Sequence, residues 1–205
     1  MKIRTISVFL CACFLVFSMV RAAQVSGSGE IYVTSVLKSA AGAVRTYGIV
    51  LNDSIQVKDI RIDKADGRTT LKYPVYISRG GKEYPQFEIL TRQAKEEIEK
   101  AVLSDKSSSK SSKQMSFKIS DFSPLSGESS RKVNACVDFN DAVRIYCGVM
   151  ESGRGPWISW PSVKNESGGK WLKQIVITNR SLRYAVEKAL VDKYSEYNAE
   201  SSEEK

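Results

Sequence analysis

The sequence predicts an α+β fold of two repeated modules, each a mainly antiparallel β-sheet followed by one α-helix. Two observations carry this prediction. Two β-rich runs meet at Asn52-Asp53 and again at Asn140-Asp141, 88 positions apart, and the surrounding residues repeat with them. In each half of the chain, runs that alternate with period two come first and a run with helical spacing comes last. We expect the two modules to pack against each other as an intrachain pseudo-dimer, which would cover the sheet edges and faces that a single module leaves open.

The first module is expected over 30–104. Asn and Asp tolerate the positive φ of a tight primed turn, so Asn52-Asp53 predicts a hairpin. The run Leu71 to Ile77 is predicted to be a strand that Pro74 places at an edge or bulge. Thr91 is the predicted N-cap of a helix with one apolar face, formed by Ala94, Ile98, Ala101 and Val102.

The second module is expected over 115–197, after a Ser/Lys-rich linker at 105–114. We align Phe117 with Ile31 at a spacing of 86 and Trp160-Pro161 with Tyr73-Pro74 at 87. Asn179 is the predicted cap of a second helix. Its inward residues are predicted to be Leu182, Val186, Ala189, Leu190 and Tyr194. The polar, largely acidic tail at 198–205 is expected to be disordered.

The N-terminus predicts export. A short basic start precedes an uncharged, mainly apolar run from Thr5 to Val20, and Val20-Arg21-Ala22 offers acceptable residues for cleavage after Ala22. Residues 1–22 therefore resemble a signal peptide, which would leave the protein periplasmic or extracellular. An uncleaved membrane anchor and a lipoprotein modified at Cys13 are the alternatives. Cleavage removes three basic residues and no acid, so the formal net charge falls from +8 to +5, a balance that suits anionic partners.

Catalysis and metal binding have little support in the sequence. The chain has no histidine, which excludes histidine-based nucleophile triads and the usual imidazole metal sites. Its carboxylates show no spacing that pairs them in a cleft, and Arg79-Gly80-Gly81-Lys82 lacks the length and the Ser or Thr of a phosphate loop. We expect a protein that is not an enzyme, with no cofactor and no metal.

Cys136 and Cys147 are the two cysteines outside the N-terminal apolar run. In an oxidising compartment they could form a disulfide that staples the second hairpin. A two-residue turn would make them diagonal neighbours on one face, which is less favourable than direct opposition, although a wider loop or bulge could change this. The disulfide and the reduced, buried pair are both open at this stage.

Several segments together resemble the SpoVG family (stage V sporulation protein G, a regulator of septation). They are Val133 to Ile145 with its Val-Asp-Phe-Asn-Asp-Ala-Val turn, Trp160-Pro161-Ser162-Val163-Lys164, Gly168-Gly169-Lys170-Trp171 and the terminal helix. The resemblance covers nearly all of 115–197 and, more weakly, 30–104. It implies that the two modules mimic one family dimer. Family members are cytoplasmic, bind nucleic acid, influence septation and gene expression, and are not known as enzymes.

Basic and aromatic residues near strand ends and helix starts are the candidate binding residues. Basic side chains bind phosphate, and aromatic rings stack on unpaired bases. The alternative is that the tryptophans belong to the core or the module interface and that the lysines only keep the protein soluble. The basic candidates are Arg79, Lys82, Lys164, Lys170, Lys173, Arg180 and Arg183, and the aromatic ones are Trp157, Trp160 and Trp171.

These observations predict an exported, non-enzymatic, SpoVG-like protein that works by binding and acts in septation or at the cell envelope. Its ligand is not identified by the sequence; an anionic polymer is one class. The rival hypothesis is a cytoplasmic nucleic-acid-binding regulator of septation or gene expression, as in the family. A weaker third hypothesis is an adhesion or polysaccharide-binding module that uses the exposed tryptophans.

Overall fold

The computed structural model describes residues 29–39, 45–65, 67–108, 115–164 and 169–203. The predicted signal peptide, its cleavage site and most of the predicted linker lie outside these residues. None of the described helices is both long enough and apolar enough to cross a membrane.

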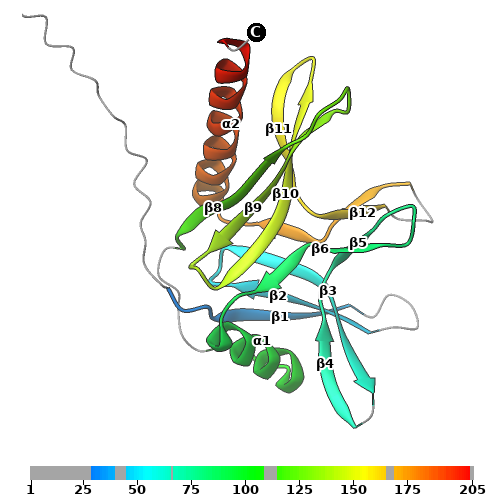
Figure 1. The fold of residues 1–205 in the computed structure, drawn as a ribbon. Helices are drawn as coiled ribbons and strands as arrows, with labels where there is room; N and C mark the ends of the chain where they lie inside the picture. Colours follow the sequence, from blue (N-terminus) through cyan, green and yellow to red (C-terminus); the bar gives the residue numbers. More distant parts are fainter. Residues whose placement is uncertain (1–28, 40–44, 66, 109–114, 165–168, 204–205) are drawn as a thin grey trace, which may run out of the picture.

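The fold is α+β, with two large, mostly antiparallel sheets and two helices (Figure 1). The first sheet has the order β1 (Val33–Ser39), β2 (Thr46–Leu51), β3 (Ile55–Ala65) and β14 (Ile175–Ile177), and β4 (Arg68–Lys72) also pairs with β3. The second sheet has the order β11 (Gly155–Ser159), β10 (Val143–Ser152), β9 (Arg131–Phe139) and β8 (Phe117–Pro124), and β7 (Phe87–Ile89) also pairs with β10.

Two small hairpins project from these sheets in the same direction (Figure 1). We call them the arms. The first arm pairs β5 (Val75–Ile77) with β6 (Glu83–Pro85), and the second pairs β12 (Ser162–Lys164) with β13 (Trp171–Lys173). The predicted strand over 71–77 is therefore two strands, and the break at Tyr73-Pro74 separates the first sheet from the first arm.

Each large sheet contains one short strand from the other half of the chain. Strand β7 precedes the first helix but pairs with β10, with Ile89 opposite Val143. Strand β14 follows the second arm but pairs with β3, with Ile177 opposite Ile55. This exchange ties the two halves together through backbone hydrogen bonds as well as through side-chain packing.

Both predicted hairpin turns are confirmed. The φ values are 47° and 49° at Asn52 and Asp53, and 52° and 51° at Asn140 and Asp141. Asn52 Oδ1 accepts a hydrogen bond from Tyr32 N at 2.7 Å, and Asn140 Oδ1 accepts one from Ser116 N at 2.8 Å. Both asparagine Nδ2 groups donate to the Glu30 carbonyl oxygen, at 3.1 and 3.3 Å. The two turns therefore converge on one backbone oxygen.

The predicted alignment of Phe117 with Ile31 is wrong by two residues. Phe117 pairs with Phe139, and the residue that pairs with the equivalent Leu51 is Val33. Side chains alternate along a strand, so a shift of two residues keeps the same face inward. Periodicity alone cannot detect such a shift.

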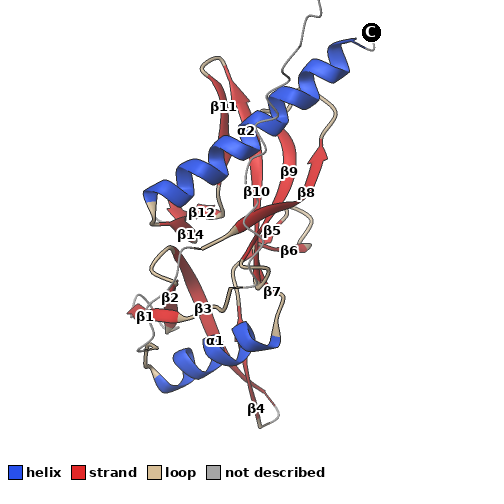
Figure 2. Ribbon diagram, turned by 90° about the vertical axis from the view of Figure 1, so that its left-hand side faces the viewer, coloured by secondary structure: helices blue, strands red, loops and turns tan. Residues whose placement is uncertain are grey.

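The two helices lie at opposite ends of the molecule (Figure 2), and each contacts strands of both large sheets. Helix α1 (Arg92–Ser104) lies against β1 and β7, and its four predicted inward residues are buried. Helix α2 (Arg180–Glu203) lies against β10, β11 and β14, and Val186, Leu190 and Tyr194 are buried. The predicted caps are confirmed, since Thr91 Oγ1 accepts from Ala94 N at 3.2 Å and Asn179 Oδ1 accepts from Leu182 N at 3.1 Å.

The tail at 198–205, expected to be disordered, is helical as far as Glu203. Alanine and glutamate in this segment favour helix, and α2 is already nucleated, so each further residue adds a backbone hydrogen bond at little cost. The buried apolar side chains of both sheets and both helices form one continuous core.

Candidate ligand-binding groove

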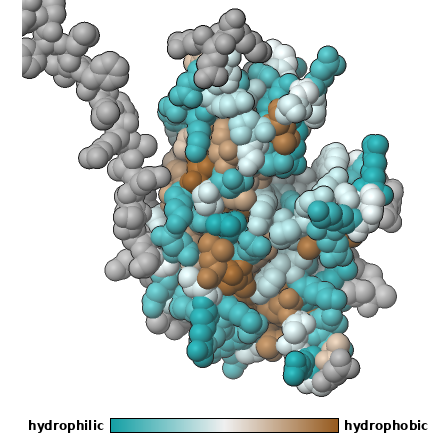
Figure 3. Space-filling view, in the orientation of Figure 1, coloured by the Kyte–Doolittle hydropathy of each residue, from teal (hydrophilic) through white to brown (hydrophobic). Residues whose placement is uncertain are grey.

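A cavity of about 700 Å³ lies between the two arms and the polar face of the second sheet. We call it the groove. Its floor comes from β8, β9 and β10, and its walls come from the arms and from the segment that joins β11 to β12. Figure 3, drawn from the same side as Figure 1, shows a recess between the arms and the upper part of the molecule. The lining residues on the floor include Asp121, Ser123, Arg131, Asn134, Cys136 and Tyr146.

The first arm presents two tyrosines to the groove. Tyr76 and Tyr84 are opposite each other in the hairpin, with ring centroids 6.3 Å apart and planes inclined by 36°. Both rings stay exposed, at 53% and 42%. Lys82 Nζ lies 5.0 Å from the centre of the Tyr84 ring, so a cation and an aromatic face are presented together.

The second arm presents a tryptophan and two lysines. Lys164 pairs with Trp171, and Ser162 pairs with Lys173. Ser162 and Trp171 line the groove. Because alternate residues share a face, Lys164 and Lys173 lie on that same side of the hairpin. Trp171 is 67% exposed, although burial would normally be favourable for so large an apolar ring.

The bases of the two arms are held in the same way. Gln86 N donates to the Pro74 carbonyl oxygen at 3.1 Å, and Gln174 N donates to the Pro161 carbonyl oxygen at 2.9 Å. Next to Pro161, the Trp160 indole Nε1 donates to Glu187 Oε1 of α2 at 2.8 Å. Trp160 is therefore fixed by a partner outside the groove and forms part of its wall.

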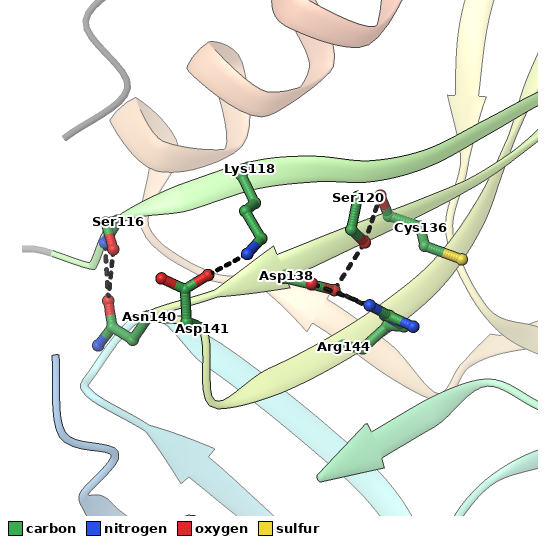
Figure 4. A network of polar contacts seen from close by, with 8 residues as sticks. All are labelled: Ser116, Lys118, Ser120, Cys136, Asp138, Asn140, Asp141 and Arg144. Atoms are coloured by element: carbon green, nitrogen blue, oxygen red, sulfur yellow. Dashed lines mark hydrogen bonds and ion pairs between the residues drawn. The ribbon is translucent and has the colours of Figure 1, made fainter. Parts of the chain in front are cut away.

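A buried ion pair lies farther along the same face of the second sheet (Figure 4). Arg144 donates to both carboxylate oxygens of Asp138, at 2.7 and 3.0 Å, and Ser120 Oγ donates to Oδ1 at 2.7 Å. Burial opposes ionisation of Asp138, but the hydrogen bonds from Arg144 and Ser120 outweigh it, so the pKa of this carboxyl is lowered. These hydrogen bonds hold the Asp138 carboxylate in place on the polar face.

Tyr146 connects this face to the exchanged strand β7. Its hydroxyl donates to Glu88 Oε2 at 2.7 Å, and its backbone N–H donates to the Gln86 carbonyl oxygen at 3.2 Å. Burial, together with the hydrogen bond to Glu88, raises the pKa of Tyr146 to about 12. The phenol is therefore protonated at neutral pH, and it is held on the floor of the groove by the other half of the chain.

Of the two alternatives left open by the sequence, the structure has the reduced, buried pair, because Cys136 and Cys147 are free and buried. Cys136 pairs with Tyr146, and Cys147 pairs with Ala135. Each cysteine is thus next to the residue opposite the other, which places the two thiols on opposite faces of the sheet. The reason is a turn with one more residue than expected, since Phe139 pairs with Val143. Burial raises the pKa of Cys136 to about 11 and that of Cys147 to about 12, so both are protonated at neutral pH.

Arg131 lies over the floor of the groove. A Cβ on Gly148 would be 2.7 Å from Arg131 Nε, so the guanidinium occupies the space that the missing side chain leaves. One terminal nitrogen, Nη2, donates to the Cys147 carbonyl oxygen at 3.1 Å. No carboxylate of the described residues forms an ion pair with Arg131. The remaining guanidinium donors are available to a ligand.

Part of the predicted set of binding residues meets at the groove. Trp160 and Trp171 line it, and Lys82, Lys164 and Lys173 lie on the arms around it. Arg79 lies in the turn of the first arm, and Lys170 lies directly before β13. The residues that lie elsewhere are Trp157, which pairs with Met150 on the outer hairpin, and Arg180 and Arg183 at the start of α2, where Arg183 forms an ion pair with Glu187.

Five residues of the groove were not among the candidates predicted from the sequence: Tyr76, Tyr84, Arg131, Asn134 and Tyr146. The repeat offered a way to find one of them, because Tyr84 follows Gly80-Gly81-Lys82 much as the candidate Trp171 follows Gly168-Gly169-Lys170. Nothing in the sequence indicated that Arg131 lies over Gly148, since that contact depends on the register of β9 and β10.

In the part of the chain that the structure describes, no group of three or more Cys, Asp or Glu side chains is arranged to hold a metal ion. No family model matches the chain, and neither the curated proteins nor the solved structures gave a match. The function must therefore be inferred from the groove and its surroundings.

Proposed function

We propose that this chain is an exported, non-enzymatic, SpoVG-like binding protein whose ligand occupies the groove between the two arms. The observation that carries the proposal is the groove itself. Three aromatic side chains stay exposed on its walls, and lysines on both arms surround them. Exposed aromatic rings around a cavity of this size are typical of small-ligand and oligomer sites.

We further propose that the fold is a tandem of two repeated modules that mimics a family dimer. Contacts related by about 88 residues support this. The Lys58 N to Gln174 O bond corresponds to the Tyr146 N to Gln86 O bond, with the two halves interchanged. The hairpin turns, the backbone bonds at the bases of the arms and the helix caps also recur at a spacing of about 88 residues. A reciprocal exchange of this kind is what two subunits related by a two-fold axis would make.

The role that we propose is in septation or at the cell envelope. The apolar run before Ala23 and the SpoVG-like segments support it. N-terminal sequencing of the protein from fractionated cells tests the export step. A chain that begins at Ala23 in the periplasmic or extracellular fraction is the expected result, and an intact Met1 in the cytosol would contradict export.

Binding in the groove is tested with two tryptophan variants. The mature chain is sedimented with insoluble envelope material, and the bound fraction is measured. Trp171→Ala should lower the affinity about tenfold, since loss of one stacking ring costs about 1–3 kcal/mol. Trp157→Ala is the matched control, because this ring is also exposed (49%) but does not line the groove. An equal loss of affinity in Trp171→Ala and Trp157→Ala would mean that the groove is not the binding site.

A cytoplasmic nucleic-acid-binding regulator is the second candidate. Lys82 over Tyr84 and Lys164 beside Trp171 favour it, because single-stranded nucleic acids bind to positive grooves with stacking rings. This candidate requires an affinity for single-stranded DNA or RNA that falls steeply with salt concentration. An affinity that is insensitive to salt would rule out phosphate contacts as its basis.

A further inference from the structure

We infer that the groove is selective for an acidic oligosaccharide, a chain of sugar rings with widely spaced carboxylates, and that Arg131 receives one carboxylate. This inference rests on the proposed function, since it names the ligand class of the same site. It follows from three properties of the groove: the kind of hydrogen-bonding groups that line it, the environment of Arg131 and the position of the exposed rings.

The polar lining of the groove is mostly uncharged. Serine hydroxyls and side-chain amides provide both donors and acceptors, among them Ser123, Asn134, Ser159 and Ser162. Such groups suit the many hydroxyls of a sugar, which also donate and accept. The amide and hydroxyl groups come from the floor and from both sides of the cavity, so they could contact a ligand along its length.

The charged groups of the lining are one cation and one anion, Arg131 and Asp121. A phosphodiester chain carries a negative charge at every residue, and some of these charges would lie near the Asp121 carboxylate. In a glycan with one carboxylate in every second sugar, one carboxylate would pair with the Arg131 guanidinium, and neighbouring sugar hydroxyls would donate hydrogen bonds to Asp121. The floor of the groove therefore favours sparse charge over dense charge, while Lys82, Lys164 and Lys173 add positive charge on the arms around it.

Arg131 is positioned for a planar anion. Its guanidinium is held over Gly148 and anchored by one hydrogen bond, from Nη2 to Cys147 O at 3.1 Å. Arginine binds carboxylates through two parallel N–H donors, and pre-organisation of the fork lowers the entropy lost on binding. The absence of an acidic partner among the described residues leaves this group for the ligand.

The exposed rings provide flat apolar surfaces at the sides. Tyr76 and Tyr84 on the first arm and Trp171 on the second line the cavity while remaining 42–67% exposed. A sugar ring has one face made largely of C–H groups, which packs on an aromatic ring through apolar contact. The arms thus supply stacking, and the floor supplies hydrogen bonds and one charge.

The test uses the mature chain, residues 23–205, and three soluble probes whose affinities are measured by calorimetry. The acidic probe is a tetrasaccharide of alternating N-acetylglucosamine and N-acetylmuramic acid without peptides. The neutral probe is chitotetraose, which has the same backbone and no carboxylate. The third probe is a single-stranded DNA decamer. We expect the acidic glycan to bind about tenfold more tightly than chitotetraose, which corresponds to about 1.4 kcal/mol.

Arg131→Gln should remove this tenfold preference, because it should lower the affinity for the acidic glycan about tenfold more than the affinity for chitotetraose. Gly148→Ala should do the same without removing the charge, because its methyl group displaces the guanidinium. Tyr84→Ala should weaken both glycans. Arg154→Gln, at an exposed arginine outside the groove, is the control and should change nothing. Melting temperatures establish that each variant is folded, and Gly148→Ala serves if Arg131→Gln does not fold.

Equal affinity of the wild-type chain for the two glycans would overturn the inference. Tighter binding of the DNA than of the acidic glycan, lost in Tyr84→Ala, would also overturn it but would leave the groove as the binding site. Failure of all three probes to bind would contradict both the inference and, if envelope material also fails to bind, the proposed function.

Discussion

At the scale of single residues, the polar face of the second sheet depends on the pairing of Asp138 with Arg144. Asp138 is 3% exposed, so an unpaired charge there would be costly. Arg144 contacts both carboxylate oxygens and remains partly exposed, at 31% of its side chain. The pair therefore keeps the carboxylate charged while the guanidinium keeps some of its hydration.

Asp138→Asn should lower the free energy of unfolding by about 2 kcal/mol, since it removes charge-assisted hydrogen bonds and leaves Arg144 without its partner. Urea unfolding at neutral pH measures the change. Asp192→Asn is the control, because Asp192 pairs with Lys188 on the exposed side of α2 and should contribute little. An equal effect of the two substitutions would show that burial of Asp138 does not matter.

The same pair makes stability depend on pH. The pKa of Asp138 is lower in the folded chain than its ordinary value of 3.8. The stabilisation is therefore complete above about pH 4 and is lost as the pH falls through the folded pKa. The stability of wild type and Asp138→Asn should converge at acid pH. A constant difference down to pH 2 would contradict the ionised pair.

At the scale of elements, the two hairpin turns show what local sequence determines. Asn-Asp tolerates positive φ, and alternating apolar residues on both sides specify the strands, so both hairpins could be predicted. The number of residues in the turn could not be predicted from propensity. The extra residue moved Cys147 to the face opposite Cys136, and the choice between a disulfide and a reduced pair depended on that detail.

Asn140→Gly and Asn140→Ala separate two contributions at this turn. Both variants lose the hydrogen bonds to Ser116 N and Glu30 O, about 1 kcal/mol each. Alanine must also adopt φ near 52°, which costs roughly a further 1 kcal/mol, whereas glycine adopts it freely. Chemical unfolding should therefore rank wild type above Asn140→Gly and Asn140→Gly above Asn140→Ala. The reverse order of the variants would contradict the left-handed turn.

The arms mark the limit of prediction from sequence at this scale. The run Leu71 to Ile77, which contains β5 of the first arm, was predicted to be a strand, and the aromatic candidates Trp160 and Trp171 do line the groove. That the arms leave the large sheets and enclose a cavity depends on strand pairing between distant segments. Short strands carry too little local pattern to determine their partners. Arg131 and Tyr146 could not be predicted as lining residues for the same reason.

At the scale of the whole molecule, the exchange of β7 and β14 makes each sheet depend on the other half of the chain. Val57 of β3 pairs with Ile175, and Ile145 of β10 pairs with Phe87. The buried side chains form one core across both sheets. We expect the chain to unfold as one cooperative unit and not as two independent halves.

Ile175→Ala tests this coupling. Ile175 is fully buried and belongs to the second half of the chain, so the substitution should cost about 3 kcal/mol. It should also speed amide exchange in β3 of the first half, which hydrogen exchange at Val57 and Gln56 would detect. Ile77→Ala is the control, since Ile77 is 58% exposed on the first arm. Two separate unfolding transitions would show that the exchanged strands β7 and β14 do not couple the two halves of the chain.

The most direct test of the groove is amide hydrogen exchange of residues 23–205 with and without peptide-free acidic glycan strands. An isolated two-stranded hairpin is marginally stable, so both arms should exchange rapidly in the free chain. A ligand held between them should slow exchange in β5–β6 and in β12–β13 together, with little change in α1. Slower exchange in one arm only, or on another surface, would contradict a ligand-binding groove between the arms.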